Sequence, residues 1–164
     1  MKPEVAIVGA GYVGMPLARV FAESGKNVVL VDVNEAVVEG INRGESHIDD
    51  VPSASLGKLV GEGRVAATGD YDAVKDADAI LIALPTPLSS QREPDLTILR
   101  GAVEEIASRL QKGQLVVLES TTYPGTTLWI VPTVTGAFER MIAMVGSRTP
   151  NGLWTWTTSK RRLA

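Results

Sequence analysis

The first 134 residues predict an α/β fold, a Rossmann-type doubly wound parallel sheet of about five strands with helices on both faces. Five short runs of Val, Ile, Leu and Ala are apolar at nearly every position, which is typical of strands buried on both faces. Helical patterns separate these runs, and strands joined by helices form parallel sheets. The expected strands are residues 5–8, 28–31, 64–68, 79–84 and 115–118.

Residues that begin or end helices support the segments between the strands. Pro16 falls in the first turn of the first helix, where its missing N–H has little cost, and Gly25 follows the end of that helix. Ser53 is the expected cap of a third helix, and Asp95 that of a long helix through Lys112. Ligands of such sheets bind at the carboxyl ends of the strands, so chemistry is expected in the loops that follow them.

The loop after the first strand reads GxGxxG and leads into a helix. Gly9 permits a tight turn, Gly11 lets the backbone approach a pyrophosphate, and Gly14 allows the helix to pack close to the sheet. The positive end of that helix favours phosphates. Asp32 ends the second strand, where a carboxylate accepts hydrogen bonds from adenosine ribose and repels a 2′-phosphate. This fingerprint predicts NAD rather than NADP, and its full context disfavours the alternative of a glycine-rich turn without a ligand.

Missing and isolated residue types exclude several kinds of site. The sequence has no cysteine, so disulfides, thiolate zinc sites and a thiol nucleophile are excluded within it. His47 is the only histidine, and its polar surroundings predict a surface loop rather than a catalytic base. Four aspartates without a nearby histidine indicate a solvated face rather than a metal site: Asp70, Asp72, Asp76 and Asp78. We therefore predict no metal.

Composition and charge are typical of one globular domain. The chain has 164 residues, of which 45% are hydrophobic and 21% charged. Its apolar runs are far too short to cross a bilayer and no signal peptide is recognisable, so a cytoplasmic protein is expected. The net charge of −3 is uneven, because residues 135–164 carry five Lys or Arg and one Asp or Glu. No amphipathic pattern organises those charges, so neither nucleic acid nor a membrane is an expected partner.

Several motifs, in the same order, resemble the UDP-glucose/GDP-mannose dehydrogenase family. They are residues 11–18, 41–44, 77–78, 84–87, 119–121 and 124–127. Residues 85–88 followed by 92–96 are most similar to the branch that oxidises UDP-N-acetylhexosamines, typified by UDP-N-acetylglucosamine 6-dehydrogenase. The resemblance runs from residue 4 to about residue 134.

The resemblance implies an NAD-dependent oxidoreductase in polysaccharide precursor synthesis. Members of the family oxidise the C6 alcohol of the sugar to a carboxylate in two steps, through a thiohemiacetal on a cysteine. That cysteine belongs to a C-terminal substrate domain that residues 1–164 do not contain. The resemblance therefore implies that this fragment is inactive alone and that a UDP-sugar binds only together with the missing domain. Full-length members oligomerise.

The resemblance also implies roles for individual residues. The pyrophosphate would be held by Gly9, Gly11, Tyr12, Val13 and Gly14. Asp32 would bind the adenosine ribose, and Thr86 would contact the ribose on the nicotinamide side. Thr121 would bind near the cofactor and position the reactive water, since a hydroxyl both donates and accepts. From the residues alone, the prolines beside Thr86 equally fit a strand end, and the hydroxyls of residues 120–122 equally fit helix caps.

These patterns divide the chain into an NAD-binding Rossmann domain, residues 1–134, and an atypical basic tail, residues 135–164. The tail is expected to be irregular and poorly ordered. Codons for residues 147–154, read from one base earlier, can encode Ala-Tyr-Ser-Glu-Arg-Val-Val, close to a family motif of the form S-P-E-R-V. A frameshift near residue 135 is therefore our hypothesis for the tail, and a genuine basic tail is the alternative.

Three functions remain open on these grounds. The first is the NAD-binding half of a nucleotide-sugar 6-dehydrogenase. The second is a standalone NAD-binding module without catalysis. The third is the N-terminal domain of a 3-hydroxyacid or 6-phosphogluconate-type dehydrogenase, against which residues 85–87 and 119–121 argue.

Overall fold

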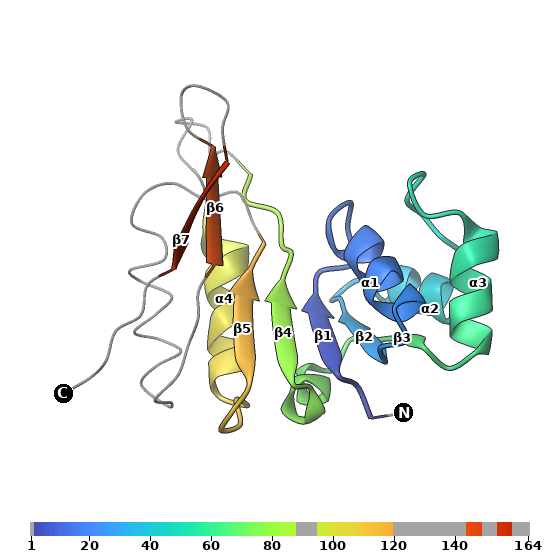
Figure 1. The fold of residues 1–164 in the computed structure, drawn as a ribbon, viewed down its shortest axis with the longest axis horizontal. Coiled ribbons are helices and arrows are strands. Elements are labelled where there is room, and N and C mark those ends of the chain that lie inside the picture. The colour runs from blue at the N-terminus through green and yellow to red at the C-terminus, as the bar shows by residue number, and fades with distance from the viewer. Residues whose placement is uncertain (1, 88–94, 120–143, 149–153, 159–164) are drawn as a thin grey trace.

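The computed structural model describes residues 2–87, 95–119, 144–148 and 154–158, and its main feature is a five-stranded parallel sheet. The strands are β1 (Val5–Val8), β2 (Val28–Val31), β3 (Val65–Thr68), β4 (Ala79–Ile82) and β5 (Leu115–Leu118). Their order is β3-β2-β1-β4-β5, with β1 at the centre (Figure 1). The fold class expected from the sequence is confirmed, although β4 ends two residues earlier than expected.

Alternate residues of the central strands enter two separate cores. Val5 and Ile7 of β1 belong to the core under α1 (Gly14–Glu23), α2 (Glu35–Asn42) and α3 (Ser53–Gly61). Ala6 and Val8 belong to the core under α4 (Thr97–Ala107) and the 3₁₀ helix η1 (Tyr71–Asp76). All four residues of β1 are buried, because helices cover both faces of the sheet. This arrangement is the doubly wound sheet predicted from the apolar runs.

Three helix boundaries differ from the sequence prediction. Leu96 rather than Asp95 occupies the N-cap position of α4, although the Asp95 carboxylate accepts a hydrogen bond from the Thr97 N–H at 2.9 Å. Pro52 occupies the N-cap position of α3, and the Ser53 hydroxyl instead accepts a hydrogen bond from the Ser46 N–H at 2.9 Å. The long helix ends at Ala107 rather than at Lys112. At the start of α3, the hydrogen bond from Ser46 occupies the hydroxyl that was expected to cap the helix.

The tail contains strands, which corrects the expectation of an irregular segment. β6 (Met144–Arg148) and β7 (Trp154–Thr158) form an antiparallel two-stranded sheet of their own, with Gly146 opposite Trp156. The segment Trp-Thr-Trp-Thr-Thr combines aromatic and β-branched residues, which favour strands. Pro150 and Gly152 lie in sequence between the two strands and interrupt neither of them. The division of the chain at residue 134 stays a prediction.

Candidate cofactor-binding site

The glycine loop connects β1 to α1 at the carboxyl edge of the sheet. Gly9 has φ of +101°, and a Cβ there would lie 2.5 Å from the Ala83 carbonyl oxygen. A Cβ on Gly14 would lie 1.8 Å from the Gly9 carbonyl oxygen. The fold itself therefore requires glycine at positions 9 and 14. A Cβ on Gly11 would meet no heavy atom within 4 Å, so the protein leaves room beside this backbone for a ligand.

Backbone donors gather in the same loop. Within the part of the chain that the structure describes, the N–H groups of Gly11, Tyr12 and Val13 donate no hydrogen bond. They precede the N-terminus of α1, which starts at Gly14 and carries the positive end of the helix dipole. The side chains of Tyr12 and Val13 are exposed. Unsatisfied N–H groups at a helix N-terminus favour an anion, so the loop fits the pyrophosphate of a dinucleotide.

Asp32 links the glycine loop to the start of α2. Its Oδ2 accepts a hydrogen bond from the Ala10 N–H at 2.8 Å, and its Oδ1 accepts one from the Asn34 N–H at 2.9 Å. Each carboxylate oxygen has further acceptor capacity, so ribose hydroxyls can still donate to it. Asn34 in turn caps α2 by accepting from the N–H groups of residues 36 and 37. Sequence reasoning assigned the ribose contact to Asp32 but missed its bond to the loop.

A pocket of about 620 Å³ lies beside Asp32. Its walls include Val33, which follows β2, and Tyr71, which begins η1. One face of α4 supplies another wall with Ile98, Gly101, Ala102 and Glu105, and Arg109 follows just beyond the helix end. We call this cavity the Asp32 pocket. Sequence reasoning missed it, although polar residues 105 and 109 continue the helical spacing of Ile98.

Tyr71 is half-buried between charged groups of the Asp32 pocket. Burial raises the pKa of its phenol above the usual value, and the negative charges of Glu105 and Asp32 raise it further. The phenol therefore keeps its proton at neutral pH. Tyr71 and the two carboxylates line the same pocket.

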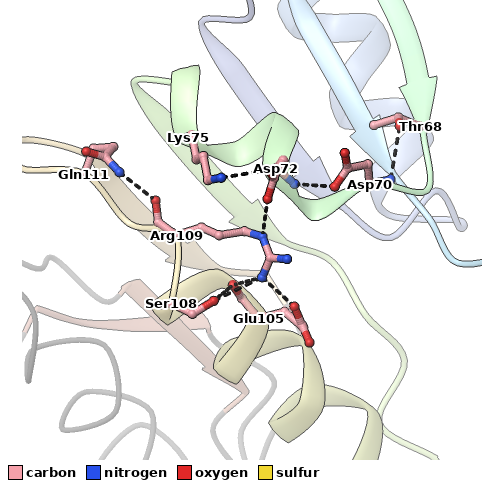
Figure 2. Close-up of polar contacts among 8 residues, drawn as sticks. All are labelled: Thr68, Asp70, Asp72, Lys75, Glu105, Ser108, Arg109 and Gln111. Carbon is pink, nitrogen blue, oxygen red and sulfur yellow. Dashed lines mark hydrogen bonds and ion pairs between the residues drawn. The ribbon is translucent and has the colours of Figure 1, made fainter.

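Arg109 joins α4 to η1 through an ion-pair network (Figure 2). Its Nε donates to the Asp72 carboxylate at 2.7 Å, and its Nη1 donates to the Glu105 carboxylate and to the Ser108 hydroxyl. Lys75 donates to the other Asp72 oxygen at 2.7 Å. Hydrogen bonds from Lys75 and Arg109 hold the pKa of Asp72 below its usual range. Asp72, one of the four aspartates that were expected to form a solvated face, thus connects η1 to the residues that follow α4.

The end of the candidate site farther from Asp32 is formed by the residues that follow β4 and β5. Thr86 is half-buried, four residues after the end of β4. The Glu119 N–H donates to the Ile82 carbonyl oxygen at 2.8 Å, and partial burial raises the pKa of the Glu119 carboxyl. The close approach of Gly9 to Ala83 brings the glycine loop next to this end. Thr121 lies outside the described residues.

Three further expectations concern the histidine, metal sites and membrane-spanning helices. His47 is exposed in a loop, as predicted from the sequence. Among the described residues, no three His, Cys, Asp or Glu side chains are grouped as metal ligands. The same residues include no helix that is both long and apolar enough to span a bilayer.

The doubly wound sheet, the glycine loop and the carboxylate beside it define a dinucleotide-binding domain. The model of the UDP-glucose/GDP-mannose dehydrogenase family, NAD binding domain, matches residues 3–145. The chain therefore belongs to this family, and its cofactor is NAD.

Individual relatives agree with this assignment. UDP-N-acetyl-D-mannosamine dehydrogenase of Escherichia coli (strain K12) is 43% identical over 123 residues, which are 75% of this chain and 29% of that protein. UDP-glucose 6-dehydrogenase of Haloferax volcanii is 37% identical over 131 residues, 78% of this chain and 30% of that protein. The solved UDP-D-ManNAc dehydrogenase of Pyrococcus horikoshii is 32% identical with a TM-score of 0.77, covering 85% of this chain and 35% of that one. The chain spans less than a third of the length of both curated relatives.

Proposed function

We propose that the chain is the NAD-binding half of a nucleotide-sugar 6-dehydrogenase that acts on a UDP-N-acetylhexosamine. The observation that supports this most is the glycine loop, where open space beside Gly11 meets three free N–H groups and the Asp32 carboxylate. The family match and the names of several relatives favour a nucleotide sugar over the 3-hydroxyacid and 6-phosphogluconate alternatives.

In this proposal the chain binds and orients the cofactor. The N–H groups of residues 11–13 and the open space beside Gly11 hold the pyrophosphate, while Gly9 and Gly14 allow the tight turn and the close packing that shape the loop. Asp32 accepts hydrogen bonds from the adenosine ribose, and Thr86 contacts the ribose on the nicotinamide side. Thr121 positions the reactive water. Bound NAD supplies the hydride acceptor, while the residues of this chain fix the place of its nicotinamide.

The binding half of the proposal is tested with a pair of glycine variants. A Cβ at Gly11 and a Cβ at Gly61 would both meet no heavy atom within 4 Å, but Gly61 ends α3, away from the loop. We expect Gly11→Val to abolish calorimetric NAD⁺ binding and Gly61→Val to leave it unchanged. Equal binding by both variants would contradict the assignment of the loop.

The catalytic half of the proposal requires residues that this chain lacks. The thiohemiacetal route needs a thiolate nucleophile, and the 164 residues contain no cysteine. We expect the pure chain to produce no NADH from a UDP-sugar, and a mixture with a matching substrate domain to do so. NADH production by the chain alone would overturn this part of the proposal.

The particular sugar and the cellular setting also belong to the proposal. Relatives are named for UDP-N-acetylmannosamine and for UDP-glucose, whereas the residues after β4 favour the branch typified by UDP-N-acetylglucosamine. Comparing the three UDP-sugars in the reconstituted mixture would rank them. We further propose a cytoplasmic role in polysaccharide precursor synthesis, with oligomerisation through the substrate domain. Cell fractionation and sedimentation of the mixture test these two points.

A further inference from the structure

The α4 side of the Asp32 pocket is a wall with free space in front of it. Residues 98, 101, 102 and 105 recur at helical spacing on the side of α4 that lines the pocket. A Cβ on Gly101 would meet no heavy atom within 4 Å, so packing does not require glycine at this position. Gly101 widens the pocket, just as Gly11 opens the space beside the loop.

Arg109 is held in one orientation at the end of this wall. Asp72 accepts from its Nε, while Glu105 and Ser108 accept from its Nη1 (Figure 2). Its Nη2 carries two further N–H donors, and these have no acceptor in the described part of the chain. Because two carboxylates fix the planar guanidinium, little side-chain entropy remains to be lost when Nη2 binds a ligand.

Glu105 supplies an acceptor beside this donor. Its Oε2 accepts from Arg109, and its Oε1 has no hydrogen bond within the described residues. The polar chain from the Thr68 hydroxyl through Asp70 to Asp72 ties the network to the end of β3 (Figure 2). The pocket wall thus presents a donor and an acceptor side by side.

We propose that Arg109 and Glu105 select the base of the dinucleotide, favouring adenine over a 6-oxo purine. This inference rests on the proposed function, because a ribose bound to Asp32 directs its base into the Asp32 pocket. On its N7 edge, adenine offers the N7 acceptor next to its 6-amino donor, which complements the Nη2 donor and the Oε1 acceptor. A 6-oxo purine places a second acceptor opposite Glu105, and that arrangement is repulsive.

The test compares NAD⁺ with nicotinamide hypoxanthine dinucleotide, its 6-oxo analogue, by calorimetry on the full chain. We expect wild type to bind NAD⁺ roughly tenfold more tightly, since a paired donor and acceptor typically discriminate by that order. Glu105→Gln should reduce or reverse the ratio, because an amide can donate to the 6-oxo group. Arg109→Met should weaken the binding of NAD⁺ more than the binding of the analogue. Arg109→Lys is a second variant, which keeps the positive charge.

Controls separate recognition from folding. Arg43→Met and Glu45→Gln remove an exposed ion pair of 2.9 Å that lies outside the pocket, and both should keep the wild-type ratio. Far-UV circular dichroism confirms that each variant is folded. Equal wild-type affinities, or a ratio unchanged in the Glu105 and Arg109 variants, would overturn this inference while leaving NAD⁺ binding in place. Failure of wild type to bind either dinucleotide would overturn the proposed function as well.

Discussion

The phosphate end and the base end of the candidate site are built from different parts of the chain. At the phosphate end, glycines and backbone N–H groups of residues 9–14 form the cradle within one continuous segment. At the base end, side chains from η1 and α4, which cover the same face of the sheet, line the Asp32 pocket. A cradle made of backbone depends on a short spacing of residue types. A wall made of side chains depends on which elements pack together, so it becomes visible only in three dimensions.

The largest effect is expected at the phosphate end from Gly14→Ala. Its Cβ would lie 1.8 Å from the Gly9 carbonyl oxygen, and neither backbone can move without separating α1 from β1. We expect a loss of about 3 kcal/mol in the free energy of unfolding, measured by urea denaturation. Gly11→Ala is the matched control and should be nearly neutral in the same measurement. Equal stability of the two variants would show that the loop relaxes and is not fixed by packing.

The junction between the two ends is tested by Asp32→Ala. Wild type should bind NAD⁺ more tightly than NADP⁺, because the carboxylate repels a 2′-phosphate. The variant should lose that preference and also bind NAD⁺ about tenfold more weakly, since charged hydrogen bonds to the ribose and to Ala10 disappear. Calorimetry with both dinucleotides measures this, with the exposed Asp50→Ala as control. A preference retained in Asp32→Ala would place the selectivity elsewhere.

The base end should respond to Gly101→Ala in two opposite ways. Gly101 is exposed in the interior of α4, and alanine there should raise the free energy of unfolding by about 0.5–1 kcal/mol. The added methyl group narrows the Asp32 pocket, so NAD⁺ affinity should fall. Gly40→Ala in α2 should stabilise the folded protein, because its Cβ would lie 3.6 Å from the Glu45 carbonyl oxygen, which is an ordinary contact. This variant should leave the affinity for NAD⁺ unchanged, because Gly40 does not line the Asp32 pocket. Unchanged affinity in Gly101→Ala would remove α4 from the base end.

The smallest effect concerns the pH dependence of the ion-pair network. Because Lys75 and Arg109 lower the pKa of Asp72, the folded state binds fewer protons than the unfolded state between the two pKa values. The stabilising contribution is therefore complete above the usual aspartate pKa and is lost as pH falls through the lowered pKa of the folded protein. Urea unfolding of wild type and Asp72→Asn should differ at neutral pH and converge in acid. The exposed Asp49→Asn should show no such convergence, and a constant difference in Asp72→Asn would contradict this account.

Much of the fold followed from local patterns in the sequence. The runs around Ile7 and Leu30 predicted buried parallel strands, because near-continuous apolar runs are typical of strands that helices cover on both faces of the sheet. The glycine positions were equally readable from the motif. Only the clash at Gly14, with the Gly9 carbonyl oxygen, is local, because a Cβ on Gly9 would meet Ala83, which is distant in the sequence.

Features that depend on contacts between distant segments could not be predicted from the sequence. The bond between Asp32 and the Ala10 N–H joins residues 22 positions apart, and the Arg109–Asp72 pair joins residues 37 positions apart. The strands of the tail did not follow for another reason, because Gly146 lies within β6 and Pro150 lies in sequence between β6 and β7, and both residue types are uncommon in strands. Thr121 lies outside the described residues and stays a prediction.

The hydrogen bond from Ala10 to Asp32 has a consequence for how cofactor preference can change. The Asp32 carboxylate anchors the glycine loop, and in the proposed function the same carboxylate also selects the ribose. A substitution that admits a 2′-phosphate therefore also frees the loop, and the chain must then order that loop each time a dinucleotide binds. Converting this domain from NAD to NADP requires at least two changes, one that accommodates the phosphate and one that restores an acceptor for the Ala10 N–H. In this proposal, the preference for NAD and the rigidity of the glycine loop both depend on the Asp32 side chain.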